Sequence, residues 1–159
     1  MRRMPAQRFV MAGVIPPPPL SPAVFDATRA LARTLPNLEV RGHLDRRQLG
    51  EFLTTSGLFL HTSEIEGFPN TMLEAWAHGL PTVSVVDPDG IVSRERFGEL
   101  AGDPDAMEAA VTRWMADPER RRSAGARARA YVERAHAPDA IVDRVAAVLD
   151  DVIRKVRGG

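Results

Sequence analysis

The sequence predicts an α/β fold, with a Rossmann-like parallel sheet and helices on both faces. Short apolar runs alternate with longer segments of helical periodicity, and the runs are continuously apolar, as in strands that parallel sheets bury. Two later helix starts, Asp103-Pro104 and Asp117-Pro118, share a design in which an Asp cap precedes a first-turn Pro. A chain of 159 residues that alternates in this way is typical of one domain, whose ligands bind at the carboxyl ends of the strands.

The expected elements follow one another along the chain with short connections. Apolar or β-branched runs predict strands at 8–12, Leu38–Arg41, 58–61 and 82–86. Helices are expected from Ser21-Pro22 to about 35, from Asp45 to about 53, and over 70–78 with Gly79 as the C-cap. Residues 87–102 are rich in turn formers, and residues 103–156 read as helices that end in one long apolar stripe.

Composition excludes several classes of function. The 21 basic and 21 acidic side chains cancel, so the chain lacks the basic field that binds nucleic acid. There is no cysteine, which excludes disulfides, thiol nucleophiles and cysteine-based zinc sites. Lys155 is the only lysine, so a Walker A phosphate site or a Schiff base is excluded from the body of the fold. No apolar stretch approaches the roughly 18 residues of a membrane span, so we expect a cytoplasmic protein, either free or peripheral to a membrane.

The densest group of polar and glycine residues, 62–75, comes directly after the third expected strand. Gly67 can let the backbone approach a ligand or adopt a positive φ, and Pro69 stiffens the entry to the next helix. The first amides of that helix carry the positive end of its dipole and suit a phosphate. Glu74, one turn in, can accept two hydrogen bonds from a vicinal diol. A purely structural interpretation stays open, because the dipole alone favours Glu in a first turn.

Other polar residues indicate less. His43, His61, His78 and His136 lack the spacing of a metal site, so we expect no metal centre. The arginines at 120–122, with Arg127, Arg129 and Arg134, fall on an expected helix. They favour a solvated helix face over an anion-binding patch.

Segment 57–81, GLFLHTSEIEGFPNTMLEAWAHGLP, resembles the signature region of family 4 glycosyltransferases with the GT-B fold. Its core is Glu66, seven residues and Glu74, set among the Gly67-Phe68, Glu74-Ala75 and Gly79-Leu80-Pro81 groups. Segments 37–45 and 102–132 resemble the flanking parts of the same domain, so the resemblance extends over roughly residues 8–150.

The resemblance implies that residues 1–159 are a single C-terminal, donor-binding half of a GT-B fold, with a helical tail. It implies a retaining glycosyltransferase of the hexosyltransferase type, with a nucleotide diphosphate sugar as donor and no metal or other cofactor. Glu66 is the catalytic candidate and would contact the donor sugar without a nucleophilic role, while Glu74 would bind the ribose hydroxyls. The implied donor-binding set is Ser63, Glu66, Gly67, Phe68, Pro69, Asn70, Thr71, Met72 and Glu74.

The sequence also departs from the family pattern. The lysine that grips the diphosphate has no counterpart, and Asp87-Pro88-Asp89-Gly90 replaces the usual Gly-Gly-x-x-Glu stretch. The N-terminal acceptor domain and the first βα unit of the donor domain are expected to be absent. Two functions therefore stay open: an enzyme completed by a separate acceptor-binding half, or a non-catalytic truncated module for protein interaction or regulation. A homodimer formed through an exposed sheet edge is a third, structural possibility.

Overall fold

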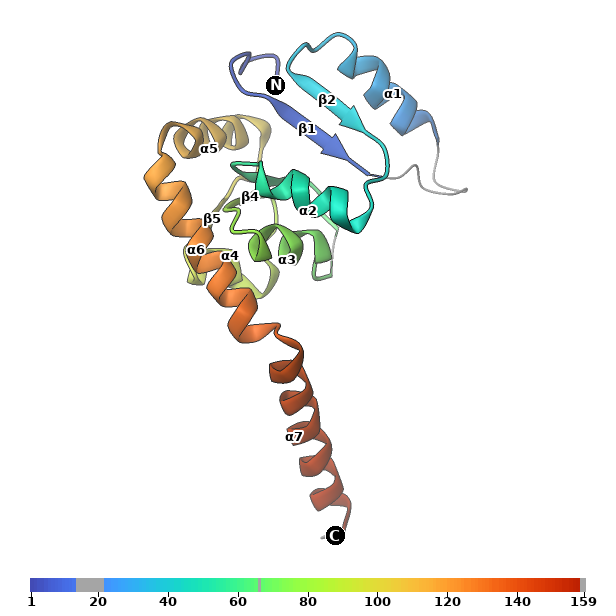
Figure 1. The fold of residues 1–159 in the computed structure, drawn as a ribbon, viewed down its shortest axis with the longest axis vertical. Coiled ribbons are helices and arrows are strands. Elements are labelled where there is room, and N and C mark those ends of the chain that lie inside the picture. Colours follow the sequence, from blue (N-terminus) through green and yellow to red (C-terminus); the bar gives the residue numbers. More distant parts are fainter. Residues whose placement is uncertain (14–21, 66, 158–159) are drawn as a thin grey trace. The chain divides into compact units, whose positions relative to one another are not determined.

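The computed structural model describes residues 1–13, 22–65 and 67–157, shown in Figure 1. These residues form two compact units, Met1–Phe52 and Leu53–Gly159, and each is described by itself. The expectation of a single domain over the whole chain stays a prediction. No helix in the described part is long and apolar enough to cross a membrane.

The first unit contains a two-stranded parallel sheet and a helix. Strand β1 (Phe9–Ala12) pairs with β2 (Leu38–Arg41), in a register that runs from Phe9 opposite Leu38 to Ala12 opposite Arg41. Helix α1 (Pro22–Ala32) connects the two strands, as the right-handed crossover of parallel strands requires. Among the described side chains of this unit, Phe9, Leu35 and Leu38 are apolar and buried.

Side-chain hydrogen bonds fix the start of β2 and the start of the following helix. The side-chain amide of Asn37 donates to the carbonyls of Met4 and Gln7, both at 2.9 Å, and so ties the N-terminal turns to the start of β2. At α2 (Arg46–Thr54), the Asp45 carboxylate accepts from the Gln48 amide at 2.8 Å, and the Gln48 side chain accepts from the Asp45 amide at 2.9 Å. This reciprocal pair is a capping box, and it confirms Asp45 as the predicted start of the helix.

The second unit contains a three-stranded parallel sheet in the order β3-β4-β5. Strands β3 (Phe59–His61) and β4 (Thr82–Ser84) are joined by α3 (Asn70–Ala77). A 3-10 turn, η1 (Pro88–Gly90), and α4 (Ile91–Arg94) lead to β5 (Gly98–Leu100). Three longer helices follow: α5 (Pro104–Ala116), α6 (Pro118–Ala135) and α7 (Pro138–Arg157).

The parallel α/β class is confirmed, with differences in detail. The strands predicted at 58–61 and 82–86 are shorter, and β5 lies within the stretch predicted to be turns. A three-residue strand that begins with Gly98 and contains Glu99 has no alternating or apolar pattern, so no local signal predicts it. The described strands also form two hydrogen-bonded sheets, where the sequence predicted one.

The core of the second unit is built around two tryptophans. Trp76 and Trp114 are 0% and 2% exposed, so both lie in this core. The Trp76 ring packs against Phe97 at 4.7 Å and edge-on against Tyr131 at 5.9 Å between centroids. Its indole Nε1 donates to the Thr82 hydroxyl at 2.8 Å, so the buried hydroxyl of a core strand is satisfied.

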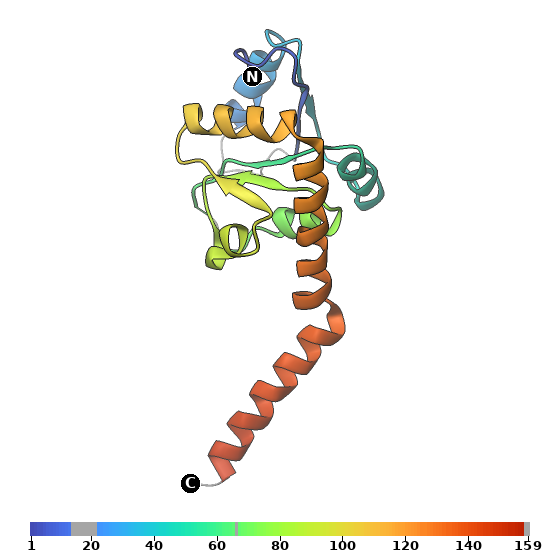
Figure 2. The same ribbon diagram turned by 90° about the vertical axis from the view of Figure 1, so that its left-hand side faces the viewer.

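Helices α5 and α6 begin as the sequence predicted. Asp103 accepts from the Ala106 amide at 2.7 Å, and Asp117 accepts from the Arg120 amide at 2.9 Å. Figures 1 and 2 both show α7 continuing beyond the end of α6, with no other described element of the second unit beside most of its length.

Candidate functional site

The carboxyl ends of β3 and β4 meet at one edge of the sheet in the second unit. His61 ends β3 and Ser84 ends β4, and both side chains are buried. The Ser84 hydroxyl lies 3.4 Å from His61 Nδ1 and accepts from the Val86 amide at 3.0 Å, while the Val85 amide donates to the His61 carbonyl at 3.2 Å. These bonds hold the starts of two loops, 62–69 and 85–90, next to each other. This is the edge where parallel folds bind their ligands.

The first loop leads into a helix whose N-terminus has no side-chain cap. Pro69 precedes α3 in an extended conformation, and its carbonyl accepts from the Met72 amide at 3.0 Å. The amides of Asn70 and Thr71 have no acceptor among the described residues. Because Met72 and Trp76 are fully buried, the helix is fixed from beneath while its positive end stays open.

The loop itself presents both backbone and side chain to solvent. Gly67 is exposed, and no atom lies within 4 Å of the position that a Cβ would occupy there. This open space agrees with the role of access to the loop backbone that the sequence suggested for Gly67. The Ser63 hydroxyl contacts the Ile65 carbonyl at 3.5 Å. Phe68 is half-buried and packs edge-on against Trp76, with 6.0 Å between ring centroids.

Of the two motif carboxylates, the structure describes Glu74 but not Glu66. Glu74 is exposed on α3, and its carboxylate makes no hydrogen bond or ion pair with another described residue. Glu66, the catalytic candidate, lies outside the described residues. The structure therefore brings Ser63, Gly67, Phe68, Pro69, Asn70, Thr71, Met72 and Glu74 to one loop and one helix turn.

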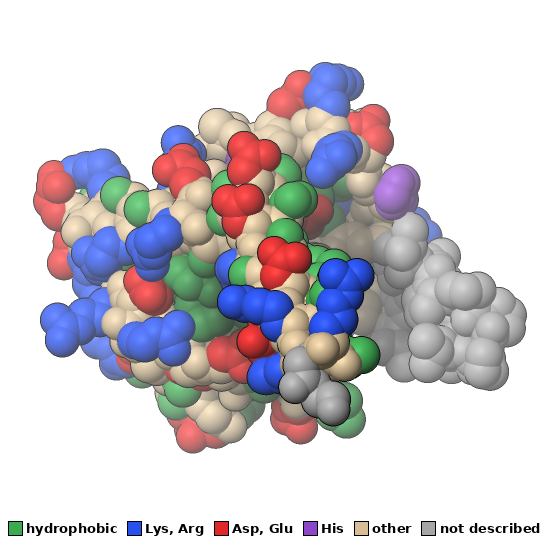
Figure 3. All heavy atoms as spheres, turned by 90° about the horizontal axis from the view of Figure 1, so that it is seen from below, with side chains coloured by type: hydrophobic (Ala, Val, Ile, Leu, Met, Phe, Trp, Pro, Cys, Tyr) green, Lys and Arg blue, Asp and Glu red, His purple; other side chains and the backbone are tan. Residues whose placement is uncertain are grey.

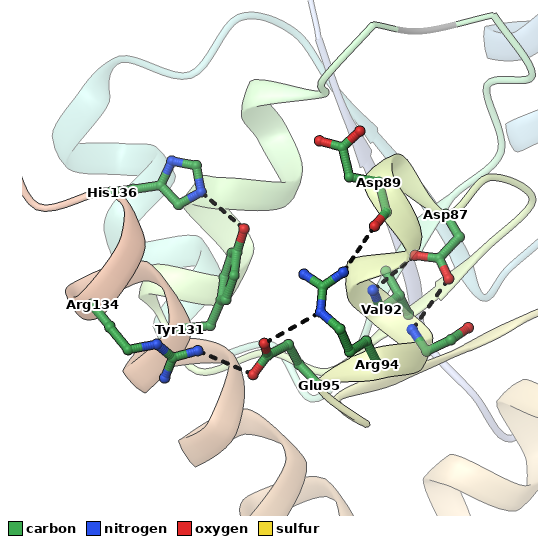
Figure 4. Close-up of polar contacts among 9 residues, drawn as sticks. Asp87, Asp89, Val92, Arg94, Glu95, Tyr131, Arg134 and His136 are labelled. Carbon is green, nitrogen blue, oxygen red and sulfur yellow. Dashed lines mark hydrogen bonds and ion pairs between the residues drawn. The ribbon is translucent and has the colours of Figure 1, made fainter. Parts of the chain in front are cut away.

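The second loop forms a self-capped turn, drawn in Figure 4. The Asp87 carboxylate accepts from the amides of Val92 at 2.8 Å and Ser93 at 3.2 Å, and so caps α4. Asp89 and Gly90 both adopt left-handed conformations, with φ of 52° and 66°. Arg94 donates to the Asp89 carbonyl at 3.0 Å. In place of the Gly-Gly-x-x-Glu stretch that the resemblance implies, this chain therefore carries a short turn fixed at both ends.

A histidine that sequence reasoning did not connect to the site packs against the first loop. The His136 ring lies 5.7 Å from the Phe68 ring, and its Nε2 is 3.2 Å from the Tyr131 hydroxyl. Burial, with a smaller effect from Arg144, lowers the pKa of His136, while burial raises the pKa of Tyr131. Burial therefore disfavours the protonated form of this imidazole. No local pattern indicates this contact, because Phe68 and His136 are far apart in sequence.

The ion pairs around α4 join it to the same end of α6. Glu95 contacts Arg134 at 3.1 Å and Arg94 at 3.8 Å, as Figure 4 shows. The second loop is thereby held against the helix that carries Tyr131 and His136.

Neither a second groove nor a metal-binding group adds to this site. A groove of about 390 Å³ lies between the end of α3, at His78 and Gly79, and residues of α6 such as Arg129. It lies at the negative end of α3, opposite the open amides, where the helix dipole disfavours an anion. Among the described residues, no group of three or more His, Cys, Asp or Glu side chains is arranged to hold a metal ion.

Most arginines of α6 are engaged by neighbouring groups. Arg120 stacks over the Trp114 ring at 4.0 Å and contacts Glu99 at 3.4 Å. Arg121 donates to the carbonyls of Trp114 and Met115, and Arg127 donates to that of Arg96 at 2.6 Å. Figure 3 shows basic and acidic side chains interspersed over the face that it presents. These contacts favour the helix-face interpretation over an anion-binding patch.

Comparisons with known proteins agree with this architecture. A family model described as "Glycosyl transferases group 1" matches residues 3–131, and the chain therefore belongs to this family. Among solved structures, WaaG, a glycosyltransferase involved in lipopolysaccharide biosynthesis, matches with a TM-score of 0.62 and 18% identity over 79% of this chain and 34% of that chain. At this identity the match shows the fold, and this chain spans about a third of the length of that protein. A comparison with curated protein sequences finds no match.

The family and the GT-B type of fold are thus confirmed. The individual donor-binding residues stay predictions.

Proposed function

We propose that this chain is the donor-binding part of a retaining glycosyltransferase and that it binds a nucleotide diphosphate sugar. The observation that carries the proposal is the open N-terminus of α3, with the carboxylate of Glu74 one turn in and without a partner among the described residues. Membership of a glycosyltransferase family supports it. A diphosphate suits the amides, and a ribose diol suits the carboxylate, at a spacing that one helical turn provides.

The proposal assigns the diphosphate to particular amides at the start of α3. The Met72 amide already donates to Pro69, so the open donors are those of Asn70 and Thr71. Gly67 would let a phosphate or sugar oxygen approach the loop backbone, since no atom occupies the space where its Cβ would be. Phe68 would hold that loop in place through its contacts with Trp76 and His136.

The chemical demand of the reaction is stabilisation of the leaving diphosphate. Fixed amide dipoles in a helix N-terminus need no reorganisation, and they would partly replace the lysine that this chain lacks. Glu66 would contact the donor sugar, and we assign it no nucleophilic role. We include no metal and no organic cofactor, because the nucleotide sugar is itself a substrate.

Donor binding by the purified chain tests the proposal. Titration calorimetry or NMR shift mapping with nucleoside diphosphates and nucleotide sugars is expected to show binding that Glu74→Gln weakens about 10- to 100-fold, as for the loss of a charge-assisted hydrogen-bond pair. Glu133→Gln on α6 is the matched control, because it removes an exposed carboxylate far from the open amides. Absence of binding at millimolar ligand, or equal effects of the two variants, would reject the site.

The second candidate is a non-catalytic module, favoured by the single lysine and by the altered turn at 87–90. A transfer assay with an acceptor-binding half added as a second chain distinguishes the enzyme from the non-catalytic module. If the pair transfers sugar from a nucleotide sugar and Glu66→Gln abolishes the transfer, the enzyme is supported. Donor binding without any transfer would favour the module.

A further inference from the structure

Four aromatic rings form a closed cycle beside the first loop of the candidate site. Phe68 packs edge-on against Trp76 at 6.0 Å between ring centroids, and Trp76 packs edge-on against Tyr131 at 5.9 Å. Tyr131 lies 5.4 Å from His136, and His136 lies 5.7 Å from Phe68. Ring pairs at such separations attract each other beyond the effect of the area that they bury. The cycle therefore joins the loop at 62–69 to helices α3 and α6.

The members of this cycle differ in what else they support. Trp76 and Tyr131 belong to the buried core of the second unit, and both also pack against Phe97. Phe68 and His136 are half-buried and lie at the margin of that core. Removing the His136 ring therefore takes one of two ring contacts from Phe68, while Trp76 still holds the core and the second contact.

The His136 ring is itself held in place. Its backbone amide donates to the Val132 carbonyl at 2.8 Å and closes α6. The carbonyl of Ala135, directly before it, accepts from Arg144 of α7 at 3.1 Å. The ring Nε2 lies 3.2 Å from the Tyr131 hydroxyl, as Figure 4 shows. These contacts make the imidazole a fixed support for the loop.

Phe68 ties the loop backbone to this support. Gly67, directly before it, is exposed, and its backbone is open on the side where a Cβ would lie. On the other side, the buried Pro69 leads into α3, whose first turn is fixed by the fully buried Met72. The open amides of α3 thus have an anchor of their own. The Gly67 backbone depends instead on the position of Phe68.

We propose that His136 is a positioning residue for the sugar half of the donor, and that it acts through Phe68 on the Gly67 backbone. This inference rests on the proposed function, in which the nucleoside diphosphate binds to α3 and the sugar to the loop. A loop held in its binding conformation lowers the ordering cost that sugar binding would otherwise carry. The nucleoside diphosphate gains little from this support, because its amides and Glu74 lie on the separately anchored helix.

Paired titration calorimetry tests the inference. UDP-glucose, GDP-mannose and ADP-glucose are each compared with the corresponding nucleoside diphosphate, and the pair that the unmodified chain binds is kept. His136→Ala is expected to weaken nucleotide-sugar binding about 10-fold, which corresponds to the loss of one aromatic pair. It is expected to change nucleoside diphosphate binding by less than about 2-fold, because separately anchored groups act independently. The ratio of the two affinities therefore falls.

Two further variants separate positioning from a general loss of stability. His136→Phe keeps a ring against Phe68 and is expected to retain the affinity ratio of the unmodified chain. Val111→Ala on α5 is the matched control, because it removes part of a buried side chain that lies outside the ring cycle. It is expected to lower the unfolding temperature and to leave the affinity ratio unchanged. Tryptophan fluorescence confirms that each variant is folded at the temperature of the titrations.

The inference is overturned if His136→Ala weakens both ligands equally, if it leaves nucleotide-sugar binding unchanged, or if His136→Phe loses as much as His136→Ala. When nucleoside diphosphate binding still depends on Glu74 in these cases, the proposed function holds and the role of His136 alone is wrong. A chain that binds neither ligand overturns the proposed function and the inference together.

Discussion

Gly125 in α6 lies against Gly79 at the end of α3, so closely that a Cβ on Gly125 would be 1.9 Å from the Gly79 carbonyl oxygen. Gly79 itself has a φ of 73°, which a side chain would strain. The C-terminal end of α3 is therefore fixed against α6 by two residues without side chains. This contact holds the helix whose opposite end carries the open amides.

Gly125→Ala is expected to destabilise the chain by about 1–3 kcal/mol. In a free helix the same change would stabilise by up to about 1 kcal/mol, so the sign itself reports the close approach. Gly102→Ala is the control, because no atom lies within 4 Å of the added Cβ. Urea unfolding followed by tryptophan fluorescence measures both. A stabilised Gly125→Ala variant would show that the helices do not meet in this way.

Trp76→Phe is expected to cost about 3–4 kcal/mol, because it shrinks a fully buried ring and leaves the Thr82 hydroxyl without its partner. Thr82→Val removes the hydroxyl instead. The double variant is expected to lose about 1 kcal/mol less stability than the sum of the losses of the two single variants. Strict additivity in the denaturation experiments would mean that the hydrogen bond contributes nothing.

Asp87→Ala is expected to lower the free energy of unfolding by about 1–2 kcal/mol, because two amides at the start of α4 lose their acceptor. Asp89→Gly, two residues on, is expected to raise it by up to about 1 kcal/mol, because glycine adopts the observed φ of 52° without strain. Thermal unfolding of the two variants gives the comparison. If both variants shifted the unfolding temperature in the same direction, the conformation assigned to this turn would be wrong.

His136 makes stability depend on pH in a defined direction. Its pKa is lowered by burial from the ordinary value of 6.5, so below that pH the unfolded chain binds the proton more readily than the folded chain. This contribution to stability is present above pH 6.5 and is lost as the pH falls from 6.5 to the lowered pKa. In unfolding experiments at matched pH values, His136→Gln is expected to flatten this part of the profile. An unchanged slope would contradict the environment assigned to His136.

Local sequence information was sufficient for most elements. Asp45, Asp103 and Asp117 cap helices because their carboxylates bond amides only three residues away. Gly79 was recognisable as a C-cap because positive φ needs no tertiary contact. The family signature at 57–81 was readable for the same reason, since a loop and the first turn of a helix are contiguous in the chain.

Contacts between distant segments escaped this reasoning. Strand β5 exists because Thr82–Ser84 offers it a parallel neighbour, and Gly98 is required there because a Cβ would be 2.4 Å from the Thr82 carbonyl oxygen. The packing of Phe68 on His136 likewise depends on groups brought together by folding.

The sequence by itself determined the parallel α/β class, the family and the loop and helix that form the candidate site, because each is encoded in residues that are neighbours in the chain. Only the tertiary structure decided which amides of α3 are open, which glycines meet, and that the apolar stripe of α7 has no described partner in its own unit. Those outcomes depend on the distance between atoms far apart in sequence, which no local pattern contains.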